Sequence, residues 1–125
     1  MDLSLDRPEG YLLVRRVGAR AITLMDRELA ASFLLAPDRV IENWPVDAAV
    51  MLDVSHVDAL LALQPELVIL GTGERQFFPA ADFMAGFLRK GIGIEVMDNA
   101  AAARTYNLLA GEGRRVVAGF ILPTT

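Results

Sequence analysis

The chain contains no cysteine and only one histidine, His56, among its 125 residues. Without cysteine it can form no disulfide framework, no thiol nucleophile and no thiolate metal site. With a single histidine, a zinc site would have to depend almost entirely on carboxylates. We therefore predict no metal site and no catalytic residues, and we expect His56 to be a surface residue in the first turn of a helix.

The chain also lacks any run of basic residues. Its 12 lysines and arginines are outnumbered by 16 acidic residues, which gives a net charge of −4. The basic residues that are adjacent occur only as isolated pairs, at residues 15–16, 89–90 and 114–115. Nucleic-acid binding requires a basic stripe that neutralises several phosphates. We therefore expect no nucleic-acid partner.

Long hydrophobic runs are absent as well, since no stretch approaches the 18 or so apolar residues of a membrane-spanning helix. The N-terminus is acidic and lacks the apolar centre of a signal peptide. We therefore expect a soluble, cytoplasmic protein. Hydrophobic residues nevertheless make up 54% of the chain. This surplus fits a face buried against a partner or a second copy, and it fits equally well an alanine- and leucine-rich composition.

The first half of the chain consists of short apolar segments separated by glycine, proline and other turn residues, a composition typical of short strands. We expect a flexible leader over residues 1–10 and one domain over residues 11–125. Strands are predicted at residues 11–17, 21–25, 29–35 and 40–44, with Pro37 and Asp38 at a turn. Their spacing is typical of an antiparallel meander. Trp44 is expected to pack in or beside the core.

The second half alternates helix and strand. Asp53 or Ser55 is expected to cap a helix that ends near residue 63, and Asp98 or Asn99 to cap one over residues 100–110. Another helix is predicted at residues 80–90, and strands at residues 67–70, 94–97 and 116–122. The strand at 67–70 has few polar residues, as in parallel sheets covered on both faces. The chain is thus predicted to be an α/β protein: a single three-layer domain with a mixed central β-sheet flanked by helices and a β-rich N-terminal half.

Gly71, Thr72 and Gly73 follow a predicted strand and precede a helix. Glycines at such a turn allow backbone amides to approach a ligand closely, and helix N-termini attract anions. The third glycine of a dinucleotide fingerprint and the lysine of a P-loop are both missing. The turn therefore has either a purely conformational role, which the pattern favours, or a role in ligand binding.

Asp98 and Asn99 follow the next predicted strand. If the two strands are parallel neighbours, both turns open at the carboxyl edge of the sheet, where open α/β folds bind ligands. The predicted cleft takes further polar groups from Arg75, Arg104, Thr105 and Asn107. Alternatively, Asp98 is only a helix cap and Arg104 a solvated helix residue. Glu95 either faces this cleft or is exposed on an edge strand.

Several short motifs occur together along the chain. They are Leu34–Asp38, Trp44, Leu70–Gly73, Gly91–Asp98, Ala102, Thr105–Leu109 and Glu112–Arg114. In this combination the chain resembles a small-domain family of unknown biochemical function that includes mitochondrial complex I (NADH dehydrogenase) assembly factor 3. The chain departs from the family pattern at Asn99, where threonine is common, and at Ala103, where cysteine is common. Neither residue supplies a nucleophile.

The resemblance implies a three-layer domain with a mixed sheet, and it implies no established activity, cofactor or catalytic residue. We therefore favour a non-enzymatic protein-interaction module, such as an assembly or accessory factor for a larger complex. The alternative is a small-molecule or anion-binding protein, or an enzyme, that uses the cleft. A homo-oligomer with paired apolar strands is a third alternative. No mitochondrial presequence is visible, so the resemblance does not imply a mitochondrial role for this chain. The sequence does not identify the protein partner.

Overall fold

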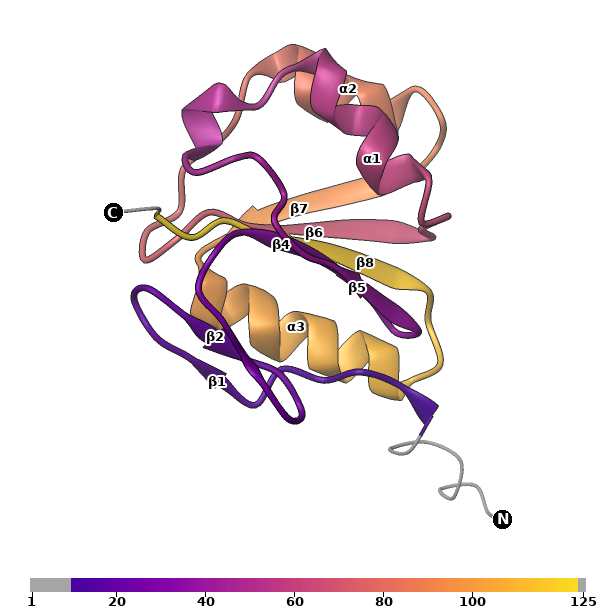
Figure 1. Ribbon diagram of the computed structural model, residues 1–125. Helices are drawn as coiled ribbons and strands as arrows, with labels where there is room; N and C mark the ends of the chain where they lie inside the picture. Colours follow the sequence, from indigo (N-terminus) through magenta and orange to yellow (C-terminus); the bar gives the residue numbers. More distant parts are fainter. Residues whose placement is uncertain (1–9, 124–125) are drawn as a thin grey trace.

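The computed structural model describes residues 10–123, and its centre is a five-stranded mixed sheet (Figure 1). The strands lie in the order β5-β4-β8-β6-β7. β8 and β7 both run parallel to β6, while β4 runs antiparallel to β8 and β5. The bounds are β4 Phe33–Ala36, β5 Arg39–Ile41, β6 Leu67–Gly71, β7 Gly93–Met97 and β8 Val116–Phe120. The predicted mixed α/β sheet is confirmed.

Two layers cover the sheet, one on each face (Figure 1). One layer holds two short 3₁₀ helices and two α-helices: η3 Ala49–Met51, η4 Val54–His56, α1 Val57–Leu61 and α2 Ala81–Leu88. The other holds the long helix α3, Asn99–Gly111, and a small antiparallel sheet of β1 Arg16–Val17, β2 Ile22–Thr23 and β3 Glu28–Leu29.

Strand β6 shows why the sheet needs both layers. Val68 and Leu70 belong to the core cluster under α1 and α2, whereas Ile69 belongs to the cluster under α3. Successive side chains of a strand point to opposite faces, so an almost wholly apolar strand must be covered twice. All three side chains are fully buried, and the prediction for this strand is confirmed. Trp44 is also a core residue, as expected.

Acidic caps start the helices where the sequence places them. The carboxylate of Asp53 accepts the Ser55 N–H at 2.9 Å at the start of η4. The carboxylate of Asp98 accepts the Ala101 N–H at 2.8 Å at the start of α3. His56 differs from the expectation: it is half-buried, and its Nδ1 accepts the Asp53 N–H in a reciprocal cap. The histidine therefore completes a helix cap and is no free surface group.

The N-terminal half differs from its prediction in three segments, at residues 11–15, 29–35 and 40–44. The strand predicted over residues 29–35 is wrong, because Ser32 separates β3 from β4 and its hydroxyl bonds to both the N–H and the carbonyl of Leu122. The strand predicted to end at Trp44 ends at Ile41, since the chain turns at Asn43 (φ 59°) to bury Trp44. The meander is therefore split between two sheets. The leader predicted for residues 1–10 lies outside the described residues, apart from Gly10.

Residues 11–15, predicted to be strand, are attached to helix α3 by side chains instead. The Asn107 amide accepts the Val14 N–H at 3.0 Å and donates to the Val14 carbonyl at 2.8 Å. The Tyr106 hydroxyl donates to the Leu12 carbonyl at 2.9 Å. Only Arg16 and Val17 pair as a strand in this region. Two backbone bonds also hold the segment, from the Leu12 N–H to the Pro37 carbonyl and from the Arg15 N–H to the Thr23 carbonyl, each at 2.8 Å. Side-chain bonds to α3 thus supply much of what a continuous sheet ladder was predicted to supply.

Tyr106→Phe should lower the free energy of unfolding by about 1 kcal/mol at neutral pH, the usual net value of one hydrogen bond. Burial raises the pKa of the Tyr106 phenol well above its ordinary value. The folded state therefore binds this proton more tightly than the unfolded chain does. That contribution is complete below about pH 10, the unfolded pKa, and is lost as the pH rises from there toward the folded pKa.

Urea unfolding at a series of alkaline pH values measures this contribution. The original chain should lose stability above about pH 10, and Tyr106→Phe should lose less. Tyr11→Phe, at the other tyrosine, serves as the control. Equal alkaline losses in the original chain and in Tyr106→Phe would contradict the assignment.

Candidate functional site

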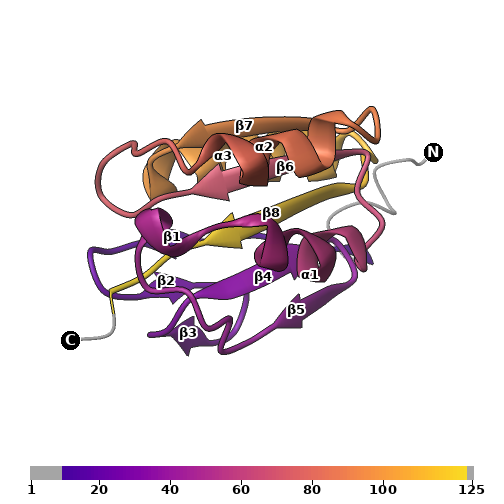
Figure 2. The same ribbon diagram turned by 90° about the horizontal axis from the view of Figure 1, so that it is seen from above.

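The carboxyl ends of three parallel strands meet at one edge of the sheet. Gly71 pairs with Met97 on one side and with Phe120 on the other. The chain leaves β6 toward α2 on one face and leaves β7 toward α3 on the opposite face (Figures 1 and 2). Such a reversal between neighbouring parallel strands opens a crevice outside their carboxyl ends. The predicted placement of the two turns at one edge is confirmed.

Asn99 connects all three strand ends. Its amide oxygen accepts the Gly73 N–H at 3.1 Å, and its amide nitrogen donates to the Ile121 carbonyl at 3.0 Å. Its backbone N–H bonds to the Gly73 carbonyl at 2.8 Å. The residue is only 3% exposed; its bond to Ile121 is buried and its bond to Gly73 is partly buried. Asn99 therefore holds the loop after β6, the start of α3 and the end of β8 together.

Gly71 makes room for that amide. A Cβ at Gly71 would lie 2.4 Å from the Asn99 Oδ1 and 3.2 Å from the Ala102 Cβ. Its φ is not positive, so the glycine is required by close packing and not by backbone conformation. Gly73, in contrast, has φ 107°, a conformation that favours glycine. Of the two alternatives for this turn, the conformational role has direct structural support.

Hydrogen bonds close the loop after β6 upon itself. The Thr72 hydroxyl donates to the Arg75 carbonyl at 2.6 Å and accepts the Phe77 N–H at 3.1 Å. The Gln76 amide donates to the Val96 carbonyl at 2.8 Å, which ties the loop to strand β7. The Thr72 hydroxyl is thus occupied within the loop.

Two adjacent hollows lie at this edge and share Ala19, Gly73 and Glu74 in their walls. The larger has a volume of about 340 Å³, and the smaller, beside Asp98 and Asn99, has about 260 Å³. The walls of the larger hollow are mainly apolar. They comprise Ala19, Asp47, Ala48, Ala49, Val50, Thr72, Gly73, Glu74, Arg75, Phe77, Ile121 and Pro123.

The structure brings six of the nine predicted cleft residues together at this edge. They are Gly71, Thr72, Gly73, Arg75, Asp98 and Asn99. The other three lie further along α3. Arg104 is exposed, Thr105 donates to the Ala101 carbonyl, and Asn107 is bonded to Val14. A helix advances about 1.5 Å per residue, so only its first turn reaches the edge.

The sequence interpretation missed the apolar side of the larger hollow. Val50 of η3 and Phe77 of the loop after β6 share its wall although they lie far apart in the sequence. Val50 is 73% exposed and Phe77 is 50% exposed. The pair Phe77-Phe78 between Gln76 and Pro79 was the available signal, because two adjacent aromatic residues outside a predicted element are unlike a solvated loop.

Five of the exposed large apolar side chains belong to η3, η4 and the loop after β6. We call the group the apolar rim; it comprises Val50, Met51, Val54, Phe77 and Phe78. η3 and the connection from β6 to α2 lie side by side in both ribbon views (Figures 1 and 2). Val50 and Phe77 share the wall of the larger hollow, and exposed apolar patches of this sort mark interaction sites or ligand grooves.

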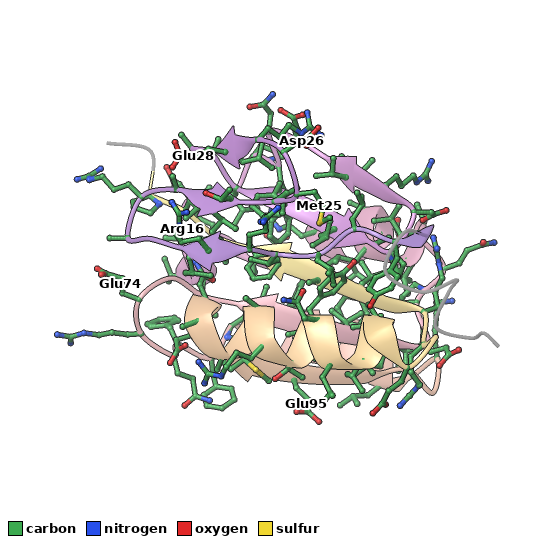
Figure 3. All side chains as sticks on the ribbon, turned by 90° about the horizontal axis from the view of Figure 1, so that it is seen from below. Arg16, Met25, Asp26, Glu28, Glu74 and Glu95 are labelled. Carbon is green, nitrogen blue, oxygen red and sulfur yellow. The ribbon has the colours of Figure 1, made fainter. Side chains whose placement is uncertain are left out.

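Charged groups at the edge are mostly exposed. Glu74 points outward from the loop after β6, and Glu95 points away from edge strand β7 (Figure 3). Glu95 therefore matches the edge-strand alternative and not the cleft alternative.

Hydrogen bonds from Ser55 hold the pKa of the Asp53 carboxyl below its usual range. Within residues 10–123, histidine and acidic side chains form no group of three that could hold a metal ion.

A family model described as a protein of unknown function, DUF498/DUF598, matches residues 14–121. The chain belongs to this family. The resemblance inferred from the short motifs is therefore confirmed. The match begins in the segment attached to α3 and ends just after β8, so it includes the whole sheet edge described above.

The names of curated proteins similar to this chain include two kinds. A Francisella tularensis protein named "13 kDa major membrane protein" is 35% identical over 84 residues, covering 66% of this chain and 68% of that protein. The human NADH dehydrogenase [ubiquinone] 1 alpha subcomplex assembly factor 3 is 31% identical over 91 residues, covering 71% of this chain. The chain spans about half the length of the assembly factors that it matches.

Solved structures of similar chains share the fold. A Xanthomonas campestris protein is 47% identical with a TM-score of 0.83, covering 98% of this chain and 92% of that chain. A Bordetella parapertussis protein is 32% identical with a TM-score of 0.84, covering 90% of this chain and 97% of that chain. None of the helices in residues 10–123 combines the length and apolar character needed to cross a membrane.

Proposed function

We propose that this DUF498 protein is a protein-interaction module that binds a partner through the apolar rim. The observation that carries the proposal is the exposure of Val50 and Phe77 around one mainly apolar hollow. Burying apolar surface contributes roughly 25 cal/mol per Å², so these side chains can drive association. The names of the curated assembly factors support a role in building a larger complex.

Several contacts favour a rigid docking surface. Val57 packs against Gly86, where a Cβ would come within 2.7 Å of its Cγ2, so α1 and α2 are in close contact. The loop that carries Phe77 is held by Thr72 and Gln76. A surface that is already ordered loses less conformational entropy on binding. The module is therefore proposed to bind without reorganising its helical layer.

Site-specific photo-crosslinking in the native host tests this proposal. A photoreactive residue at Val50 or Phe78 should give a discrete adduct of higher mass with a defined partner. The same residue at Leu108 is the matched control, because Leu108 is 63% exposed but lies on α3 in the opposite layer. Adducts of equal yield at Leu108 and Val50, or none at either rim position, would refute the rim as the docking surface. An adduct of twice the chain mass would identify a second copy as the partner, which is the homo-oligomer alternative.

The second candidate function is small-molecule binding in the larger hollow. Its volume of about 340 Å³ lies in the range of roughly 300–1,000 Å³ found for ligand pockets. An anion is disfavoured in the adjacent smaller hollow, because the Asp98 carboxylate there already accepts the Ala101 N–H at the start of α3 and Glu74 adds a second negative charge. Titration of a metabolite library should then shift the amides of residues 72–77 and 48–50 together. Scattered shifts, or none at millimolar ligand, would exclude this candidate.

A further inference from the structure

The chemistry of the partner follows from the hollow and from the charges around it. The hollow is about 340 Å³ and is lined by Val50, Phe77 and Ile121 together with smaller apolar residues. A dry cavity of roughly 150 Å³ accommodates benzene. The hollow is therefore large enough for one or two large apolar side chains of a partner.

Two acidic groups and one basic group line the hollow. Asp47 and Glu74 line it, and Arg75 is the one basic residue in its described wall. Two further exposed acids lie nearby in sequence: Asp53 opens η4, next to the rim, and Asp82 lies in the first turn of α2. Within residues 10–123, the Glu74 carboxylate has neither an ion pair nor a hydrogen-bonded partner. A cation brought beside it would therefore meet an unpaired negative charge.

An anionic membrane surface fits this pattern poorly. The cytoplasmic leaflet carries negative charge and attracts basic segments, whereas Glu74 places an unpaired carboxylate at the hollow and the whole chain has a net charge of −4. A peptide can place one apolar side chain in the hollow and a lysine or arginine beside Glu74. A bilayer rich in anionic lipids instead places net negative charge beside Glu74.

We infer that the hollow accepts an apolar anchor side chain from a partner protein, and that lysine or arginine residues flank this anchor and lie beside Glu74. The inference rests on the proposed function and adds the partner's chemistry to it. Charge complementarity at the border of an interface affects specificity and the rate of association more than it affects affinity. The apolar anchor supplies most of the binding free energy, and the basic flank selects the segment.

Short synthetic peptides test the inference on the full chain. The probe is a capped peptide with a Leu-Phe centre and lysines on both sides. One matched peptide replaces the lysines by glutamates, and another replaces Leu-Phe by Ser-Ser. In titrations followed by amide chemical shifts, the lysine peptide should shift residues 48–50 and 72–77. It should bind about fivefold or more tightly than the glutamate peptide, and the serine peptide should not bind.

Reversing the charge of Glu74 tests whether this carboxylate causes the preference for the lysine peptide. Glu74→Lys should weaken the lysine peptide by about fivefold and strengthen the glutamate peptide. Glu95→Lys is the matched control, since it makes the same change on edge strand β7, away from the hollow (Figure 3). It should change either affinity by less than about twofold. Equal effects at Glu74 and Glu95 would show that the preference for the lysine peptide depends only on the net charge of the chain, and they would overturn the inference.

Other outcomes separate this inference from the proposed function. If neither peptide binds while Val50 still crosslinks to a partner, the basic-anchor inference fails and the interaction module stands. If the glutamate peptide binds more tightly, the inferred charge of the partner is wrong. Sedimentation with phosphatidylcholine–phosphatidylglycerol vesicles that is lost in Phe77→Ser and Phe78→Ser would point to a lipid surface and would also overturn the inference.

Discussion

Asn99→Ala should lower the free energy of unfolding by about 3 kcal/mol. The substitution removes two side-chain hydrogen bonds, one to the Gly73 N–H and one to the Ile121 carbonyl. Each bond contributes roughly 1 kcal/mol, and a buried polar group left without a partner costs a further 1–3 kcal/mol or so. The original side chain is only 3% exposed, so water cannot easily replace it.

Asn107→Ala is the control for this prediction. Asn107 also forms a two-atom amide bridge, to the N–H and carbonyl of Val14, but it is half-buried. Its loss should cost only about 1–2 kcal/mol, because solvent can reach the released groups. Urea unfolding monitored by circular dichroism measures both values. Equal losses would show that Asn99 does not have the special position assigned to it.

Gly71→Ala should destabilise the chain by about 2 kcal/mol. The new methyl group would meet the Asn99 Oδ1 at 2.4 Å and both the Ala102 Cβ and the Phe120 Cδ1 at 3.2 Å. The Asn99 amide cannot rotate away without losing its own hydrogen bonds. Gly93→Ala is the matched control, since Gly93 also lies in a parallel strand but a Cβ there has no neighbour within 4 Å. That control should change stability by less than about 0.5 kcal/mol.

The double variant links the two predictions. In an Asn99→Ala background the closest clash at Gly71 disappears and only the contacts at 3.2 Å remain. Gly71→Ala should therefore cost about 1 kcal/mol less there than in the original chain, which is a coupling typical of residues in contact. Strict additivity in a double-mutant cycle would contradict the proposed packing of Gly71 against Asn99.

The packing of Gly71 against Asn99 also affects the surface proposed to bind a partner. Asn99 holds Gly73, and the loop beyond Gly73 carries Glu74 and Phe77 to the larger hollow. Loosening the Asn99 contact at the base of the loop should therefore weaken peptide binding even at temperatures where the variant remains folded. A folded Asn99→Ala variant that binds the lysine peptide like the original chain would show that the rim is ordered independently.

The C-terminal half was largely predictable because its signals are local. Strand β6 is almost wholly apolar, and Asp98 precedes α3 at the position where a side-chain cap must lie. The alternation of such strands with helices of sufficient length predicts parallel pairing. These features depend on the residue and its close neighbours, so they are visible without a structure.

The N-terminal half was less predictable because distant residues determine it. Ser32 interrupts the strand predicted over residues 29–35 through bonds to Leu122, some 90 residues away. Asn107 attaches Val14 to α3 across 93 residues. Nothing near Ser32 or Val14 in the sequence indicates these partners. Short strands of two residues also have little periodicity to detect.

The candidate site was predictable at its polar residues and not at its apolar ones. Gly71 ends β6, Gly73 and Asp98 follow the ends of β6 and β7, and parallel strands necessarily bring those ends to one edge. Arg104 and Thr105 were placed there by sequence proximity, and helix geometry carries them away. The apolar side depends on η3, whose approach to the loop after β6 follows from packing of the whole helical layer.

The sequence by itself determined the class of fold, the membership of the DUF498 family, the helix caps and the meeting of two polar turns at one sheet edge. The fold class, the caps and the shared edge follow from hydrophobic periodicity, capping chemistry and the directionality of parallel strands, whereas the family membership follows from the resemblance of short motifs along the chain. Only the tertiary structure decided that Asn99 joins three strand ends and that Val50 and Phe77 share one hollow. The reason is physical: burial and long-range hydrogen bonds depend on which distant side chains pack together, and local pattern does not record that.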